Sequence, residues 1–267
     1  MNKNSLFKEK IYSFYQKNKR DLPWRKTRDP YKILVSEIML QQTQVPRVLE
    51  KYPLFLKRFP NFKALEKSSI EQVLRIWQGL GYNRRALYLK KIAEKVQKNF
   101  GETIPKDPDI LQTFPGIGTA TASSIIVFSF NTPLVFIETN IRRVYIHEFF
   151  QKQKEVHDKE LVPLIEKTLD RVNPREWYYA LMDYGSYLGK AQVNPNRRSA
   201  HYAKQSKFEG SLRQLRGKIL KELLRQQEIK KTELEKRLKD KRLNDVIEQL
   251  KSEGFILQNK QLLTLVR

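Results

Sequence analysis

Apolar residues recur at intervals of three and four along most of this 267-residue chain, and this period restricts the fold more than any other feature. Glycine or proline stands at many of the junctions, so the connections between helices are short. Strand-like alternation is scarce before the C-terminal end. The pattern predicts an all-α architecture with helices at residues 5–18, 31–44, 46–58, 69–78, 83–99, 107–113, 119–130, 139–150, 158–170 and 174–188.

The periodicity lapses at residues 189–210, a polar and basic stretch that predicts a linker. Beyond it, residues 211–267 read as three helices and two short strands around a turn, with a capping-box sequence at Thr232-Glu-Leu-Glu235. Three helices and a hairpin indicate a small winged-helix-like domain. Such domains bind DNA, and they also serve as protein-docking modules.

The chain is strongly basic, with 52 Lys and Arg residues against 29 Asp and Glu residues, a formal net charge of +23. A globular chain with this charge most often binds nucleic acid, because the phosphate backbone is the commonest polyanion. An anionic membrane surface or an acidic protein is the alternative partner. We therefore expect a nucleic-acid-binding protein.

The sequence has no cysteine, which excludes disulfides, thiolate nucleophiles and cysteine-ligated metals. The three histidines, His147, His157 and His201, lack the short spacing of a metal site, so no metal is expected. The N-terminus has no apolar signal segment, and no apolar run approaches 18 residues. We expect a soluble cytoplasmic protein.

The stretch Phe114-Pro-Gly-Ile-Gly118 precedes an apolar helix and is typical of a helix-hairpin-helix turn. The backbone N–H groups of Gly116, Gly118 and Thr119 would bind a DNA phosphate, with room for a bound monovalent or divalent cation. Alternatively the stretch is an ordinary turn between helices. A second signal about twenty residues later is Glu138, an acid at a helix start after an apolar run.

Several motifs, in this order, give the chain a wider resemblance to a known family. They are Lys19-Arg-Asp-Leu-Pro-Trp-Arg25, Asp29-Pro-Tyr31, Ser36-Glu-Ile-Met-Leu-Gln-Gln-Thr-Gln-Val45, Gly79-Leu-Gly-Tyr82, the Pro115–Gly118 turn, Asn140 with Arg143-Val144, and Leu181-Met-Asp-Tyr-Gly185. With them, residues from about 5 to 188 resemble the helix-hairpin-helix DNA glycosylases, and within these the adenine glycosylase branch. The resemblance implies a domain of two helical lobes, with residues 31–130 forming most of one lobe. It also implies a base-excision enzyme that acts as a monomer on double-stranded DNA at the nucleoid.

By this resemblance Glu37 would protonate the departing purine. Adenine leaves poorly as an anion, so a proton must be delivered to the ring, and an apolar helix face would help to keep the carboxyl protonated. Taken alone, Glu37 reads as a surface helix acid. Gln42 and Thr43 would lie near the base opposite the excised one.

Glu138 stands where the family has aspartate, and would stabilise the sugar cation, with Asn140 orienting the acid or the attacking water. The extra methylene leaves three outcomes open: the backbone compensates, the chemistry is slower, or the protein binds without cutting. Ala120 stands where lyase relatives have lysine, so a monofunctional enzyme is expected.

The family's four cluster cysteines would fall near Gly189, Asn196, Ser199 and Gln205, which are not ligands, so no iron–sulfur cluster is expected. The basic residues 197–204 either contact phosphate in its place or form a solvated linker.

The remaining site residues follow from the same motifs. Arg20, Leu22 and Trp24 would line the pocket for the flipped base, although a core position also suits Trp24. Leu80 and Tyr82 would form a wedge that enters the duplex, or simply a tight turn. Asp183 is expected to support the hairpin rather than take part in catalysis.

The sequence thus predicts a glycosylase that excises adenine mispaired with 8-oxoguanine or guanine. The tail is too short for the family's usual C-terminal lesion-reading domain, so recognition of the opposite base would be relaxed or left to Gln42, Thr43 and Tyr82. The alternatives are a uracil or thymine mismatch glycosylase, a non-cutting mismatch or lesion sensor, and a winged-helix regulator with a relic enzyme domain.

Overall fold

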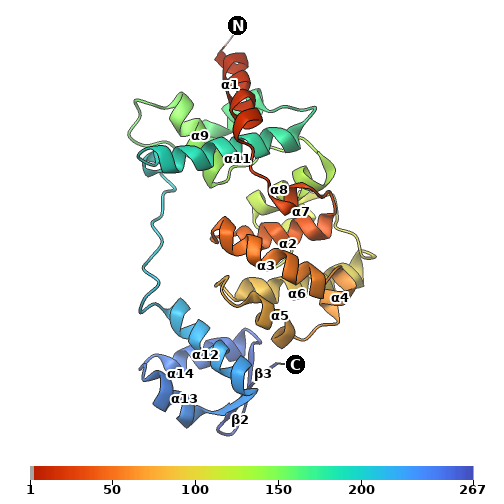
Figure 1. Ribbon diagram of the computed structural model, residues 1–267, viewed down its shortest axis with the longest axis vertical. Helices are drawn as coiled ribbons and strands as arrows, with labels where there is room; N and C mark the ends of the chain where they lie inside the picture. Colours follow the sequence, from red (N-terminus) through yellow and green to blue (C-terminus); the bar gives the residue numbers. More distant parts are fainter. Residues whose placement is uncertain (1–2, 267) are drawn as a thin grey trace. The chain divides into compact units, whose positions relative to one another are not determined.

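The computed structural model describes residues 3–266, which form fourteen α-helices, two short 3-10 helices and three strands (Figure 1). The mostly helical architecture and the small α and β region at the C-terminus were both predicted correctly. Polar side chains that cap the first backbone N–H groups mark the starts of several helices. Ser69 and Gln72 form a capping box before one helix, and the Asp107 side chain accepts from the backbone N–H groups of Asp109 and Ile110 before another.

The chain divides into two compact units, each made of several segments. The first contains the residues up to Ile33 together with 105–113 and 117–204, and the second contains 34–104, 114–116 and the residues from 205 onward. Helix α2 (Pro30–Leu40) runs from one unit into the other. The other helices of the first unit are α1 (Lys3–Asn18), η1 (Pro23–Arg25), α7 (Pro108–Gln112), α8 (Thr119–Phe130), α9 (Thr139–Phe149), α10 (Asp158–Thr168), α11 (Pro174–Ala191) and η2 (Pro195–Arg198).

Aromatic side chains dominate the core of the first unit, where α1, α9 and α11 lie together (Figure 1). Phe7 of α1 packs edge-on against Tyr145 of α9 and Trp177 of α11, with ring centroids 5.4 and 5.8 Å apart. Aromatic pairs at such distances add stabilisation beyond the area they bury. This core fixes α9, whose first turn carries Glu138.

Helix α8 belongs to the first unit, which corrects the prediction that residues 31–130 form most of one lobe. The reason is packing between aromatic rings. Phe128 near the end of α8 stacks on Tyr179 of α11 at 4.6 Å and meets Phe136 edge-on. The spacing of apolar residues along the chain does not indicate which helix α8 packs against.

The helices of the second unit besides α2 are α3 (Val45–Arg58), α4 (Phe62–Glu66), α5 (Ile70–Trp77), α6 (Arg84–Asn99), α12 (Leu212–Gln226), α13 (Lys231–Leu238) and α14 (Leu243–Ser252). Helix α4 was not predicted because its apolar pattern covers little more than one turn. The predicted helix 31–44 ends early, at Leu40, because Gln42 adopts a left-handed backbone conformation with φ of 52°. The amide run therefore forms a turn rather than a helix end.

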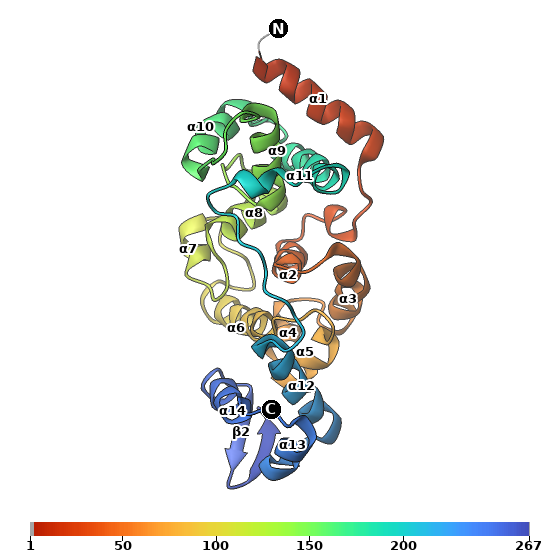
Figure 2. The ribbon, with the colours of Figure 1, turned by 90° about the vertical axis from the view of Figure 1, so that its left-hand side faces the viewer.

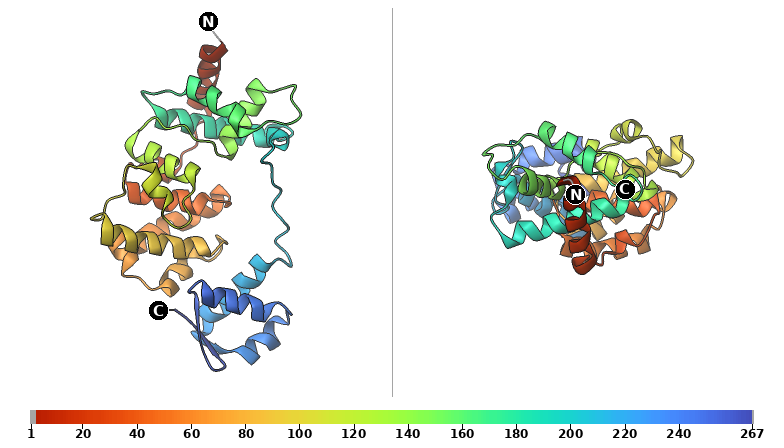
Figure 3. Two further views of the ribbon diagram at one scale, coloured as in Figure 1. Left: turned by 180° about the vertical axis from the view of Figure 1, so that it is seen from behind. Right: turned by 90° about the horizontal axis from the view of Figure 1, so that it is seen from above.

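The C-terminal domain has the winged-helix order of elements. Strands β1 (Glu228–Lys230), β2 (Ile256–Asn259) and β3 (Leu262–Leu265) form an antiparallel sheet in the order β1-β3-β2, next to helices α12 to α14 (Figures 2 and 3). The short β1 was not predicted. No helix within residues 3–266 is long and apolar enough to cross a membrane.

The predicted linker 189–210 is structured over its first half. Helix α11 continues to Ala191, and η2 packs into the first unit with Pro195 and Asn196 buried. Val156 and Ser199 form a β-bridge that holds the segment in place. Asparagine and arginine side chains make this packing possible, and a search for apolar periodicity does not detect them.

Gly185 allows α11 to approach α9 closely. A Cβ atom at this position would lie 2.4 Å from the carbonyl oxygen of Asn140, which is backbone and cannot move aside. We expect Gly185→Ala to lower the free energy of unfolding by about 2 kcal/mol. Thermal unfolding would show this as a drop in Tm of several degrees.

The matched control is Gly217→Ala on α12, where an added Cβ meets nothing within 4 Å. Because alanine is the better helix former, this variant is expected to gain up to about 1 kcal/mol. Equal Tm changes in the two variants would contradict the packing argument.

Candidate active-site residues

Glu138 caps the N-terminus of α9 with its own side chain. Its Oε1 accepts from the backbone N–H groups of Asn140 and Ile141 at 2.7 and 2.8 Å, and its Oε2 accepts from Nδ2 of Asn140 at 3.2 Å. Aspartate is a commoner residue at such a cap than glutamate. The longer side chain folds back on its own helix, so the extra methylene is accommodated within the cap.

Arg143 connects this cap to the segment that follows α11. Its Nη1 donates to Oδ1 of Asn140 at 2.9 Å and to the carbonyl oxygen of Gly185 at 2.6 Å. Its Nε donates to Oδ1 of Asn194 at 2.9 Å. Nδ2 of Asn196 donates to the carbonyl oxygen of Thr139 at 2.9 Å. The first turn of α9 is thus braced by asparagines that sequence reasoning had assigned to a linker.

The environment of Glu138 favours the protonated acid. Burial raises the pKa of the Glu138 carboxyl above its usual range, although the two backbone hydrogen bonds and the charges of Arg143 and Arg142 act in the opposite direction. Arg142 is itself paired with Asp158 at 2.7 Å. Burial outweighs these opposing effects, so the pKa of the Glu138 carboxyl stays raised.

The residues predicted for the base pocket lie in and around η1. Leu22 and Trp24 are buried, which fits the core position left open for Trp24. Arg20 donates from Nε to Oδ1 of Asp183 at 2.6 Å, and Arg25 donates to both oxygens of the same carboxylate at 2.9 and 2.7 Å. Asp183 therefore holds this segment to α11. It is hydrogen-bonded to the two arginines of the motif, and its support of the hairpin stays a prediction.

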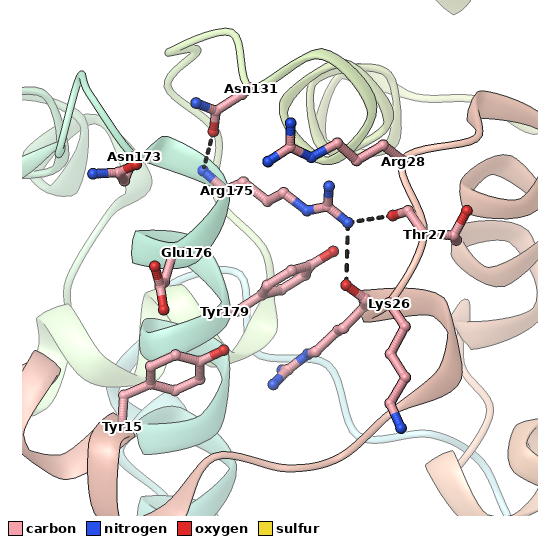
Figure 4. A pocket seen from close by; sticks show the side chains of 10 residues that line it. Tyr15, Lys26, Thr27, Arg28, Asn131, Asn173, Arg175, Glu176 and Tyr179 are labelled. Atoms are coloured by element: carbon pink, nitrogen blue, oxygen red, sulfur yellow. Dashed lines mark hydrogen bonds between the residues drawn. The ribbon is translucent and has the colours of Figure 1, made fainter.

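A cavity of about 320 Å³ lies beside this cluster, between the residues after η1 and the start of α11 (Figure 4). Arg175 crosses it and donates to the carbonyl oxygens of Arg25 and Thr27. Arg25 belongs both to the cavity wall and to the Asp183 cluster. None of the residues predicted for the base pocket lines the cavity, which is lined by Tyr15, Arg25, Lys26, Thr27, Arg28, Asn131, Asn173, Arg175, Glu176 and Tyr179.

Glu37 lies half-buried on α2, among residues that are mostly buried. Ile33, Val35 and Ile38 of the predicted apolar face are 1% exposed or less, and Leu40 is half-buried. The amide run comes directly after this helix. Gln42 is exposed, whereas Gln41 donates from Nε2 to the carbonyl oxygen of Gly116 at 3.0 Å.

Arg85 is a buried cation that joins the end of α2 to the turn before α6. Its Nη1 donates to the carbonyl oxygens of Ile38, Met39 and Gln41, at 2.9, 2.8 and 2.6 Å. Its Nη2 donates to Oγ1 of Thr43 at 2.9 Å and to the carbonyl oxygens of Leu80 and Gly81 at 3.2 and 3.0 Å. Burial lowers the pKa of Arg85 to about 10, which leaves it charged at neutral pH.

Sequence reasoning missed Arg85, although a signal was present. It lies in helical register with the buried residues Leu89, Ile92 and Val96, so an arginine occupies a position on an apolar stripe. Arg143 and Asn194 gave no comparable signal, because their partners lie 42 and 51 residues away in the chain.

The predicted wedge residues differ in exposure. Leu80 is 3% exposed, so its side chain belongs to the core of the turn in this structure, and its role as a wedge stays a prediction. Tyr82 is half-buried and has a φ of 47°, after two glycines with positive φ. Tyr82 is therefore the more accessible of the two predicted wedge residues.

The hairpin has the geometry expected of its two glycines. Gly116 has a φ of 77°, and a Cβ there would lie 2.4 Å from the ring of Tyr88. Gly118 caps α8 without a side-chain hydrogen bond, and Thr119 donates from Oγ1 to Gln112 at 2.7 Å. Within residues 3–266, no protein acceptor is bound to the backbone N–H groups of Gly116 and Gly118. These groups remain available for an anion.

Two of the positions at which cluster cysteines were expected to fall, Gly189 and Asn196, lie in close contact with α9. A side chain at Gly189 would meet the guanidinium of Arg143 at 2.7 Å, and Asn196 is bound to the backbone of α9. The described residues contain no group of three or more His, Cys, Asp or Glu side chains able to hold a metal ion. Arg198 donates to carbonyl oxygens of Ile146, Phe150 and Gln153 at the end of α9, so it is engaged with protein rather than with solvent.

Comparisons with known proteins agree with this picture. Residues 35–168 match the HhH-GPD superfamily of base excision DNA repair proteins. The chain is 35% identical over 188 residues to an adenine DNA glycosylase of Buchnera aphidicola subsp. Baizongia pistaciae, covering 68% of this chain and 53% of that protein. It is 41% identical over 135 residues to one of Mycobacterium tuberculosis, covering 50% and 44%. The chain thus spans about half the length of the curated relatives it matches.

Among solved structures, the chain is similar to a thermostable thymine-DNA glycosylase, with 26% identity and a TM-score of 0.64 over 72% of this chain and 90% of that one. Its fold is also that of endonuclease III, trapped in a covalent intermediate with DNA, with 16% identity and a TM-score of 0.55 over 79% and 93% of the two chains.

We expect Arg85→Lys to destabilise the second unit, because an ammonium group cannot reproduce the planar fork that serves six acceptors. The carbonyl groups left without donors make the expected loss about 2–4 kcal/mol in the free energy of unfolding. Chemical denaturation would measure it. Arg75→Lys, at an exposed position paired with Glu71, is the control and should change stability by less than about 0.5 kcal/mol.

Asp183 should make the stability of the chain depend on acidic pH. Burial raises the pKa of this carboxyl, but its bonds to Arg25 and Arg20 outweigh burial and leave the pKa below its usual range. A depressed native pKa stabilises the fold above the unfolded value of about 3.9, and that stabilisation is lost as the pH falls through the native pKa.

Asp183→Asn is therefore expected to lower the free energy of unfolding by about 3 kcal/mol at pH 7. The difference from the unsubstituted chain should shrink below about pH 4. Denaturant titrations at a series of pH values would measure both effects. Asp21→Asn, at an exposed position paired with Lys26, should have almost no effect at any pH.

Proposed function

The chain belongs to the HhH-GPD superfamily of base excision DNA repair proteins, and from this we propose that it is a monofunctional DNA glycosylase that removes adenine mispaired with 8-oxoguanine or guanine. One observation carries the proposal. The stretch from Ser36 to Val45 sets Glu37 on an apolar helix next to a turn of amides, in a chain 35% and 41% identical to proteins named adenine DNA glycosylase.

Binding to double-stranded DNA would depend mainly on charge. The net charge of +23 attracts the phosphate backbone, and the backbone N–H groups of Gly116 and Gly118 would bind one phosphate at the start of α8. A monovalent or divalent cation at the hairpin backbone would assist. We propose a monomer that works at the nucleoid in the cytoplasm.

The base would be flipped out of the duplex before the reaction. Unstacking costs a few kcal/mol and costs least at a mismatch, which supplies part of the selectivity. Residues 20–25, with Arg20, Leu22 and Trp24, would receive the base. Asp183 binds Arg20 and Arg25, so these two arginines would be oriented before DNA binds.

In the proposed chemistry the Glu37 carboxyl donates its proton to the adenine ring, typically at N7. The bond between the base and C1′ of the sugar breaks, and its electron pair leaves with the base. The sugar becomes an oxocarbenium-like cation, which the Glu138 carboxylate stabilises. A water molecule then adds to C1′ and gives up a proton, so the products are free adenine and an abasic site.

The cap geometry around Glu138 supports an active enzyme rather than a relic. Its two oxygens are oriented by Asn140 and by the backbone of α9, and Asn140 is held in turn by Arg143. Among the three outcomes left open by the extra methylene, this favours compensation within the site.

Two departures from the family pattern shape the proposal. Ala120 offers no amine for a Schiff base, which supports hydrolysis without strand cleavage. The absence of cysteine from the sequence supports an enzyme that works without an iron–sulfur cluster, with Asn194 and Asn196 bracing α9 instead.

A second candidate is removal of thymine or uracil opposite guanine. The similarity to a thymine-DNA glycosylase over 72% of this chain favours including these bases in any assay. A pyrimidine has no N7, so an enzyme of this kind would depend less on Glu37. A protein that binds mismatches without cutting is the remaining alternative.

The test is a single-turnover assay with alkaline workup. The duplexes carry adenine opposite 8-oxoguanine, guanine or cytosine, and uracil or thymine opposite guanine. We expect adenine release opposite 8-oxoguanine and guanine, and a loss of at least about a hundredfold in Glu37→Gln, because a positioned acid contributes that much. Glu50→Gln, at an exposed position on α3, is the control.

We also expect Glu138→Asp to fold normally, because aspartate caps helices well, but to react about 10- to 100-fold more slowly, because its carboxylate would retreat by more than 1 Å. A faster Glu138→Asp would mean that the extra methylene is a handicap. Cleavage of thymine or uracil alone would favour the second candidate. Tight binding to a mismatch without any cleavage would support the remaining alternative, a protein that binds mismatches without cutting.

A further inference from the structure

The C-terminal domain touches the turn that carries Tyr82. Within the second unit, the Tyr82 hydroxyl accepts hydrogen bonds from Nη1 of Arg213 on α12 and from Nε2 of Gln205. The Arg213 guanidinium also lies 5.2 Å from the centroid of the Tyr82 ring, within range of a cation–π interaction. Nη2 of Arg213 donates to the carbonyl oxygen of Ser206 at 2.7 Å, which fixes its orientation.

A second contact lies close by and involves Glu253, just after α14. Its carboxylate pairs with Arg84 on α6 at 2.6 Å and also with Arg216 on α12. The Glu253 side chain is only 16% exposed. Burial raises its pKa, but the bonds to Arg84 and Arg216 outweigh burial and hold the pKa below its usual range. The pair therefore remains ionic at neutral pH, and α12 lies beside α5 (Figures 1 and 2).

The exposed face of α14 is unsuited to reading DNA. In a helix-turn-helix arrangement the second helix enters the major groove, and here that helix is α14. Its exposed residues are Asn244, Asp245, Glu248, Gln249 and Ser252, which include two acids and no base. Phosphates repel such a face. Arg213 of this domain is directed at the Tyr82 turn instead.

We propose that the C-terminal domain is a specificity element in which Arg213 positions Tyr82 against the base opposite the excised one. This inference rests on the proposed function and extends it. Tyr82 has a φ of 47°, a left-handed conformation that a non-glycine residue keeps only where its surroundings hold it. Arg85 holds the backbone of the turn from inside, and Arg213 holds the tyrosine hydroxyl and ring from outside. Arg213 is thus a positioning residue and takes no part in the chemical step.

The experiment compares Arg213→Ala with Arg225→Ala in the full chain. Both residues are arginines of α12, but Arg225 is exposed and pairs only locally with Glu222, so its loss removes the same charge without touching the turn. Dissociation constants are measured on a duplex carrying a non-cleavable adenine analogue opposite 8-oxoguanine, and on a fully matched duplex. Amide hydrogen exchange of residues 79–83 is measured in the free protein.

We expect Arg213→Ala to lower the preference for the mismatched duplex by about tenfold, the size of one hydrogen bond to a charged group. Exchange at residues 79–83 should become faster in the same variant. Arg225→Ala should weaken binding to both duplexes equally and leave the exchange unchanged. Tyr82→Phe keeps every charge and removes only the hydroxyl, so it should lower the preference as well. Adding Arg213→Ala to Tyr82→Phe should cause less than the sum of the two separate losses.

Unchanged exchange at residues 79–83 in Arg213→Ala would overturn the proposal, whatever the protein binds. Equal loss of preference in Arg213→Ala and Arg225→Ala would also overturn it, since charge alone would then explain the effect. If the unsubstituted protein shows no preference for the mismatch, the proposed function fails on that result, and the exchange measurement still decides whether the domain holds the turn.

Discussion

The arrangement of the second unit depends on one buried guanidinium. Arg85 donates to six acceptors from the end of α2 and from the turn before α6, two segments about forty residues apart in sequence. Carbonyl groups at the end of a helix need donors, and water is excluded here, so a fixed cation replaces several weaker partners. The same contact places Thr43 beside Leu80. A single residue thereby joins two segments proposed to read the base opposite the excised one.

A series of hydrogen bonds braces Glu138 in the first unit. The carboxylate is held by Asn140, Asn140 by Arg143, and Arg143 by Asn194 from beyond α11. Gly185 permits the close packing that brings Arg143 to the backbone of α11. Hydrogen bonds between neutral amides and one arginine thus order the segment after α11. The sequence has no cysteine there to bind a metal cluster. Such a brace is directional, so it constrains orientation as well as distance.

Much of this could be predicted from the sequence, and the parts that could not share a physical cause. Helix α8 was located to the residue, because the hairpin glycines and the apolar run mark both ends. Glu138 and Asn140 were placed together correctly because Asn140 lies only two positions after the Glu138 cap of α9. Contacts between distant segments determine the partners of Arg143, the packing of α8 against α11 and the burial of Asn196. Local period and residue type contain no information about such contacts, nor about the pairing of Asp183 with Arg20 and Arg25.

Two residues next to carbonyl groups that Arg85 binds have left-handed backbone conformations. Gln42 and Tyr82 are not glycines, yet they have φ values of 52° and 47°. Such conformations persist only where the surrounding structure determines them, and they concentrate at binding sites. Arg85 fixes the carbonyl groups next to both residues, and Arg213 adds a contact to one of them from the C-terminal domain. The strain is therefore maintained by two independent cations. Removing Arg213 should relax the turn without altering the carboxyl groups of Glu37 and Glu138, so selectivity and chemistry are separable through this residue.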